Sequence, residues 1–408
     1  MNAASIIVLA ALSAAPALKL GDVQALEIVQ LLWLIAASAV FLYRGLRVPC
    51  SGLWRRYGPG YLAFIFLCLI ISALAFRLRF YPLPETSLFK SPGWLSMARI
   101  LEFGLDILLM LTVARAMATR RKLLHLGLSA YVWVGTLSAV ASLAGWVLMK
   151  LAAIPTFLLY GPEDRVRGFF NEGGPYGIYL VSVAIVVLFR GRVAQRSQVH
   201  LVPLAGALLL SGSKAALLAI VCLGLIAVTL VGNVQRRAAI LGATVAVLVT
   251  STLLYQGKLY GYMWSYMNFD EALEYRPGDP SLIMGRIAAA IVVPRMIANH
   301  PLLGIGAGNY SLMRNDPQYL EGLPPVDDWD LPGVGLLGTA AELGIPLTLF
   351  LVWLLLRPFS AARHSGAPAI VAVAAAFPAL AFLFGANLNF FYPWLVGAFA
   401  ISTESSQC

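Results

Sequence analysis

Twelve apolar segments, each close to the length that crosses a lipid bilayer, dominate this chain. A transmembrane helix needs about 20 mostly apolar residues. The composition agrees, because 60% of the 408 residues are hydrophobic and 12% are charged, whereas soluble domains are about 25% charged. We therefore predict an all-α polytopic integral membrane protein with about twelve transmembrane helices, of which the seventh and twelfth are short enough to be re-entrant. The segments lie near residues 3–18, 24–43, 59–76, 94–114, 123–149, 174–189, 198–212, 214–232, 238–256, 333–356, 367–386 and 389–403.

Basic residues fill every second loop between these segments, and the same loops contain no Asp or Glu. Cytoplasmic loops of membrane proteins carry such an excess of Lys and Arg. The pattern therefore places both termini in the cytoplasm and explains the formal net charge of +10 as topology, so we expect no nucleic-acid partner. The residues are Arg44, Arg47, Arg55, Arg56, Arg115, Arg120, Arg121, Lys122, Arg190, Arg192, Arg196, Arg236, Arg237, Arg357 and Arg363.

One loop, residues 256–332, is far longer than the others and falls on the outer face. Long loops in compact proteins are usually functional or disordered. This loop opens with the aromatic run KLYGYMWSYMNF, and residues 281–301 then predict an amphipathic helix with Ser281 as its N-cap and a kink at Pro294. We divide the chain into N-terminal spans over residues 1–160 and a catalytic region over residues 161–408.

Cationic residues gather on the outer side near the predicted membrane surface. Arg165 and Arg167 precede the sixth span, Lys214 begins the eighth, and Arg286 lies in the helix of the long loop. The competing interpretation is that these are ordinary interfacial residues, whose long side chains extend to the membrane surface. Glycines around Pro175, however, favour an irregular backbone that lines a cavity. Phosphate is the natural ligand of such a group, because arginine forms a fork on it and lysine adds a point charge.

Several outer residues are candidates for a catalytic base. His300 is the one histidine expected on the outer face of the membrane, and the acidic stretch that surrounds Trp329 supplies three carboxylates. A structural histidine and a solvated acidic face are the competing interpretations. The candidates are His300, Glu172, Asp327, Asp328 and Asp330.

Two further sets of residues leave alternatives open. Tyr262, Trp264 and Trp329 are suited to stacking on sugar rings, although aromatic residues also anchor proteins at the membrane interface. In the fourth span, Arg99, Glu102 and Asp106 share one helix face, which predicts a buried structural ion pair. The cysteines show no spacing typical of a disulfide or zinc site, so we expect no metal.

Four motifs, in this order, resemble the O-antigen ligase/polymerase family of bacterial envelope glycosyltransferases. They are RVRGFFNEGGPYG, SGSKAALLA, GRIAAAIVVPRMIANHPLLGIGAGNY and LLGTAAELGIPLTLF, and they lie in the C-terminal 60% or so of the chain. The resemblance implies a metal-independent, inverting enzyme without a cofactor in the bacterial inner membrane. Its active site would be periplasmic, with undecaprenyl-diphosphate-linked glycans as donor and acceptor.

The resemblance also assigns roles to residues of this chain. It implies that Arg165 or Arg167, together with Lys214 and Arg286, binds the diphosphate, with lysine at 214 where the family usually has arginine. Ligases of the family carry a histidine nine residues before the glutamate that corresponds to Glu342. Here that position is Gly333, so His300 or an acid of the 327–330 stretch would replace it.

Three functions follow from these observations. The absent histidine favours a polymerase of lipid-linked repeat units over a ligase that transfers the finished glycan to lipid A core or another acceptor. A transporter or flippase of lipid-linked sugars is the non-enzymatic alternative, and it should line a path through the bilayer with charge. The polar residues crowd one face instead. A chain-length regulator or a flippase of the same pathway is a candidate partner.

Overall fold

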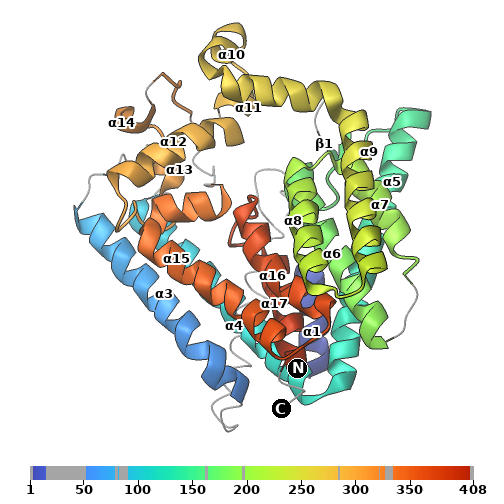
Figure 1. The fold of residues 1–408 in the computed structure, drawn as a ribbon. Coiled ribbons are helices and arrows are strands. Elements are labelled where there is room, and N and C mark those ends of the chain that lie inside the picture. Colours follow the sequence, from blue (N-terminus) through green and yellow to red (C-terminus); the bar gives the residue numbers. More distant parts are fainter. Residues whose placement is uncertain are drawn as a thin grey trace.

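The computed structural model describes residues 3–14, 52–78, 81, 91–160, 164–194, 198–283, 285–320, 322–326 and 334–404. These residues form helices and one small antiparallel sheet, in which β1 (Leu159–Tyr160) pairs with β2 (Arg165–Val166) (Figure 1). The helices are α1 (Ala3–Ser13), α3 (Gly52–Leu78), α4 (Pro92–Thr119), α5 (Arg121–Ala152), α6 (Gly173–Ala194), α7 (Leu201–Ser211), α8 (Lys214–Leu230), α9 (Val234–Met267), α10 (Phe269–Tyr275), α11 (Pro280–Ile283), α12 (Arg286–Asn299), α13 (Tyr310–Met313), α14 (Pro317–Leu320), α15 (Gly335–His364), α16 (Ala369–Leu383) and α17 (Phe391–Glu404).

Within this described part, five helices are long and apolar enough to cross a membrane: α3, α5, α15, residues 173–191 of α6 and residues 234–253 of α9. Shorter apolar helices are α7, α8, α16 and α17. Every predicted segment except 24–43, which lies outside the described residues, coincides with a helix. The prediction of a mostly helical protein with helices able to cross a membrane is therefore confirmed. The count of twelve spans stays a prediction.

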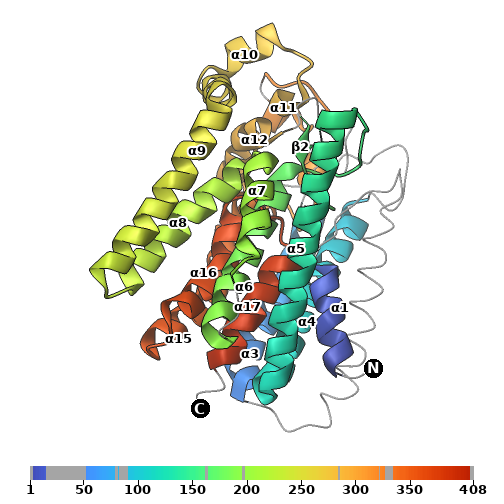
Figure 2. The same cartoon turned by 90° about the vertical axis from the view of Figure 1, so that its right-hand side faces the viewer.

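Burial separates central from peripheral helices. In the spanning part of α6, 83% of the residues are buried, against 6% in α9. Helix α16 is enclosed along nearly its whole length and packs against α15 and α17. Helix α9 packs mainly on α8, and this pair extends away from the rest of the bundle in Figure 2. Helix α6, which follows the predicted cations Arg165 and Arg167, thus lies in the centre of the molecule.

The long outer segment differs from its prediction in two ways. The aromatic run is helical and forms the last part of α9, so the outer segment begins near Asn268. The predicted helix from Ser281 is divided into α11 and α12, and the N-cap of α12 is Gly285. Helix α12 continues through Pro294. Helices α10 to α14 lie together at the top of Figure 1.

Helix α15 is interrupted at Gly344, where the backbone has φ 80° and ψ 161°. A loop from Pro301 onward docks at this break. The N–H of Ile345 donates to the carbonyl of Pro301 at 2.8 Å, and the N–H of Gly306 donates to the carbonyl of Glu342 at 2.7 Å. The segment GIGAGN is therefore part of a loop that docks on α15.

Replacing Gly344 with alanine should destabilise this joint. A Cβ at this position would lie 2.1 Å from the carbonyl oxygen of Leu302, and only glycine adopts such a backbone readily. Strain and overpacking together predict a loss of about 3 kcal/mol or more in unfolding free energy, measurable by thermal unfolding in detergent. Gly366→Ala is the control, because Gly366 also has positive φ but nothing within 4 Å of its Cβ position. Equal losses in both variants would contradict the account.

Candidate functional site

The N-termini of α6 and α8 meet, and the side chain of Arg286 at the start of α12 extends to them. The Ser213 hydroxyl donates to the carbonyl of Gly174 at 2.8 Å and accepts from the N–H of Ala216 at 3.2 Å. It therefore caps α8 and joins α8 to α6 at once. A Cβ on Gly177 would lie 2.2 Å from Ser213 Cβ, so glycine permits this close approach. A Cβ on Gly174 would lie 2.8 Å from Nη2 of Arg286.

Arg286, the first residue of α12, reaches toward this junction. Its guanidinium lies against Gly174 on one side, and its Cζ is 3.7 Å from the Cβ position of Gly385 on the other. Within the described ranges, no hydrogen bond or ion pair is found for its guanidinium. A half-buried cation beside helix N-termini attracts an anion, because the N–H groups and the helix dipoles favour negative charge.

Arg165 holds the turn between α7 and α8. Its Nε donates to the carbonyl of Ser211 at 3.0 Å, and its Nη2 donates to the carbonyl of Gly212 at 3.2 Å. Gly173 packs on the same turn, since a Cβ there would lie 2.6 Å from the Ser211 carbonyl oxygen. The position of Lys214 at the start of α8 therefore depends on Arg165.

Arg167 makes contacts of the same kind with a different segment. Its Nε donates to the carbonyl of Phe157 at 2.8 Å and its Nη1 to the carbonyl of Asn171 at 3.3 Å. The guanidinium also lies 5.8 Å from the centroid of the Tyr160 ring. Of the two arginines, Arg165 is the one bonded to the turn that starts α8.

Among the base candidates, the structure brings Glu172 to the junction of helices. Glu172 is exposed and immediately precedes the first residue of α6. His300 lies at the C-cap of α12, about 20 Å along the helix from Arg286. There its Nε2 is 2.7 Å from the hydroxyl of Tyr319. The structure therefore does not place His300 beside Arg286.

The remaining predicted residues are placed only in part. Asp327, Asp328, Trp329 and Asp330 lie outside the described residues, as does the side chain of Tyr262. Trp264 is half-buried and packs in a hydrophobic cluster with Ala272, Leu282 and Ile287, which favours a structural role.

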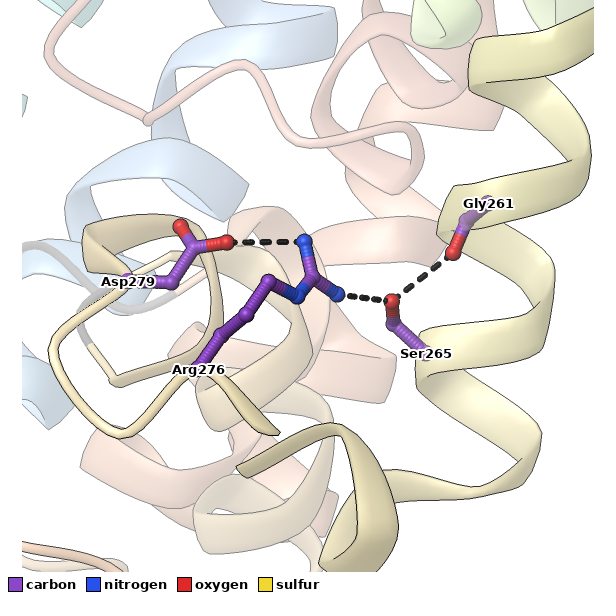
Figure 3. Close-up of polar contacts among 4 residues, drawn as sticks. All are labelled: Gly261, Ser265, Arg276 and Asp279. Atoms are coloured by element: carbon purple, nitrogen blue, oxygen red, sulfur yellow. Dashed lines mark hydrogen bonds and ion pairs between the residues drawn. The ribbon is translucent and has the colours of Figure 1, made fainter. Parts of the chain in front are cut away.

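Polar contacts fasten the end of α9 to the segment before α11. Arg276 Nη1 lies 2.9 Å from Oδ2 of Asp279, and its Nη2 donates to the Ser265 hydroxyl at 2.6 Å. Ser265 in turn donates to the carbonyl of Gly261 at 2.8 Å (Figure 3). These bonds connect the outer end of α9 with the chain that enters α11 and α12.

The ion pair predicted in the fourth span is present, without Asp106. Arg99 Nη1 lies 2.9 Å from Oε2 of Glu102, while both carboxylate oxygens of Asp106 are buried and have no hydrogen-bond partner within the described part of the chain. Glu342 accepts from the N–H of Tyr310 at 3.4 Å. Within the described ranges, no three His, Cys, Asp or Glu side chains form a group that could hold a metal ion.

Sequence reasoning missed the residues that organise the outer segment. Arg314 is buried, and its guanidinium donates to the carbonyls of Ile283 and Pro324. Burial lowers the pKa of the Arg314 guanidinium, and the neighbouring Tyr310 partly offsets this. Burial also raises the pKa of Tyr310 to about 12, an effect that Arg314 opposes and Glu342 reinforces. A lone arginine in a polar loop carries no sequence signal for such a role.

The family model described as O-antigen ligase matches residues 199–352. This range contains three of the four motifs quoted above, and RVRGFFNEGGPYG lies just before it. No curated protein matches the chain. The match supports an activity of the ligase or polymerase type, which implies a glycosyltransferase-like enzyme, lipid-linked glycan substrates and a multi-pass bacterial membrane protein. The part of the chain from just before α7 to within α15 is therefore similar to the O-antigen ligase family.

Proposed function

We propose that the protein is a membrane glycosyltransferase that polymerises undecaprenyl-diphosphate-linked oligosaccharide repeat units on the periplasmic face of the inner membrane. One observation carries the proposal: the N-termini of α6 and α8 meet, Lys214 begins α8, and the Arg286 guanidinium lies between Gly174 and Gly385 beside them. Two cations and two helix N-termini are suited to the two phosphates of a lipid diphosphate.

The energetics favour a diphosphate over a single carboxylate. Each charge-assisted hydrogen bond contributes about 1.5–3 kcal/mol net, so several are needed to hold a diphosphate at a hydrated surface. The Arg286 guanidinium offers a fork of donors, and the capped N-terminus of α8 offers backbone N–H groups. These groups also stabilise the charge that develops on the departing diphosphate.

In the proposed reaction, a hydroxyl oxygen of the acceptor glycan attacks the anomeric carbon of the donor sugar. The bond between that carbon and the diphosphate oxygen breaks, the configuration inverts, and undecaprenyl diphosphate leaves with the bonding electrons. The hydroxyl proton passes to a base. No metal or cofactor takes part in the steps that we propose.

Two sets of acids are suitable as the base. Glu172 immediately precedes the N-terminus of α6. The stretch with Asp327, Asp328 and Asp330 ends shortly before Val334, whose Cγ1 is 3.5 Å from the same Gly385 Cβ position that Arg286 approaches. The chain thus returns beside Arg286 after this acidic stretch. We place the base among these acids and favour polymerase over ligase, because Gly333 replaces the histidine of the ligases.

Reconstitution with a purified undecaprenyl-diphosphate-linked repeat unit tests the proposal. We expect a ladder of elongated products on a gel, and we expect it from the protein alone, without nucleotide sugars. Transfer to lipid A core without elongation would instead identify a ligase. Movement of the substrate across the bilayer without a new glycosidic bond would refute the enzymatic proposal and support a flippase.

A further inference from the structure

The position of the Arg286 guanidinium depends on where α12 begins. No hydrogen bond or ion pair is found for this group within the described residues. The N-cap of α12 is Gly285, which has no side chain to hold the first turn. The buried residues Ile287, Ala288 and Ala289 hold the first turn of α12 in the core, and contacts that fix the backbone just before α12 add to the placement of Arg286.

Arg314 makes such a contact. It is 1% exposed, and its Nη2 donates to the carbonyl of Ile283, the last residue of α11 and three positions before Arg286. Its Nη1 donates to the carbonyl of Pro324 at 3.2 Å and to Oδ1 of Asn315 at 3.1 Å. One buried guanidinium thus joins the chain that enters α12 to the segment at Pro324.

Asn315 extends the same joint by one residue. Its Nδ2 donates to the carbonyl of Val326 at 2.7 Å, and its Oδ1 accepts from the N–H of Val326 at 2.9 Å. Both backbone groups of Val326 are therefore fixed by one side chain. Because the same Oδ1 accepts from Arg314, the two residues hold one another in place.

We propose that Arg314, oriented by Asn315, is a positioning residue that fixes the start of α12 so that the Arg286 guanidinium faces the N-termini of α6 and α8. The inference rests on the proposed function, in which Arg286 binds the diphosphate. Arg314 itself does not contact the substrate in this account. The planar fork is essential, because Nη2 donates to Ile283 while Nη1 donates to Asn315 and Pro324. The single nitrogen of an ammonium group does not reproduce two donor positions held apart in one plane.

The test measures the affinity of the full-length protein in nanodiscs for undecaprenyl diphosphate. Arg314→Met should weaken binding about tenfold, as expected when one charge-assisted bond to the ligand is lost. Arg314→Lys should weaken it equally, because charge without the fork does not restore the geometry. Asn315→Leu, which leaves the bond to Ile283, is a milder second variant and should weaken binding about threefold.

Arg295→Met is the matched control. Arg295 lies on α12, the helix that begins at Arg286. Like Arg314, it donates to backbone carbonyls, those of Tyr319 and Leu320, at 2.9 and 3.0 Å. It does so nine positions beyond Arg286, so its loss should lower thermal stability without changing the affinity. An equal loss of affinity in Arg295→Met, or recovery in Arg314→Lys, would overturn the positioning role.

A double-mutant cycle separates this inference from the function on which it rests. In an Arg286→Ala background, Arg314→Met should weaken binding less than about twofold further, because the group that it positions is gone. If the two substitutions reduce the binding free energy by fully additive amounts, the positioning role is refuted and the proposed diphosphate site still stands. If Arg286→Ala alone leaves the affinity unchanged, the proposed diphosphate site is wrong.

Discussion

Replacing Arg286 with alanine should lower the rate of glycan elongation by about 100- to 1,000-fold. The guanidinium lies between Gly174 and Gly385, beside the N-termini of α6 and α8. Removing one preorganised donor to a developing anion typically costs a factor of this size. Arg286→Lys should recover only part of the rate, because a point charge replaces a fork. The measurement is the initial rate of repeat-unit addition by reconstituted protein.

A second variant tests the location of this group without changing any charge. Gly174→Ala would place a methyl group 2.8 Å from Nη2 of Arg286, so the guanidinium must move. Because the end of the Arg286 side chain is flexible, the change should lower the unfolding free energy only slightly. It should lower the elongation rate about tenfold, since a small misplacement of a binding group slows the reaction strongly. Wild-type elongation in both Arg286→Ala and Gly174→Ala would contradict a role for this junction.

Replacing Arg165 with methionine should lower elongation by about 10- to 100-fold. Methionine retains much of the apolar stem but leaves the carbonyls of Ser211 and Gly212 without their arginine donor. The turn that begins α8 then loses its connection to β2, and Lys214 is displaced with it. The rate of repeat-unit addition and the thermal stability of the same preparation separate displacement from unfolding.

Arg167→Met is the matched control for Arg165. Arg167 also donates to two carbonyls, but these belong to Phe157 and Asn171, away from the turn before α8. We expect Arg167→Met to lower stability with less than about threefold loss in rate. A larger loss of rate in Arg167→Met than in Arg165→Met would mean that Arg167 is the arginine that serves the diphosphate.

Hydropathy and charge were enough to predict the helices, because a bilayer requires apolar segments of fixed length and biases their flanking charges. They were not enough to predict where helices end outside the membrane. The aromatic run after Gln256 contains tyrosines, a tryptophan and methionines, which suit an interfacial loop as well as a helix. In the structure α9 continues to Met267, and a hydrogen bond between Arg276 and Ser265 holds its outer end.

The candidate site shows the same division. Composition and position identified Arg165, Lys214 and Arg286 as outer cations near the membrane. Periodicity could not show that Arg165 bonds to a turn 46 residues away in sequence. The break in α15 at Gly344 did have a local signal in the sequence, a glycine two positions before a proline. The long apolar segment around it nevertheless predicted one continuous span.

The most direct test of the central claim counts undecaprenyl diphosphate released against glycosidic bonds formed by the purified, reconstituted protein. If the protein is the polymerase that we propose, one lipid diphosphate is released for each repeat unit joined, and both products fall together in Arg286→Ala. Lipid-linked repeat units that cross the bilayer with no release of undecaprenyl diphosphate and no longer glycan would contradict the account.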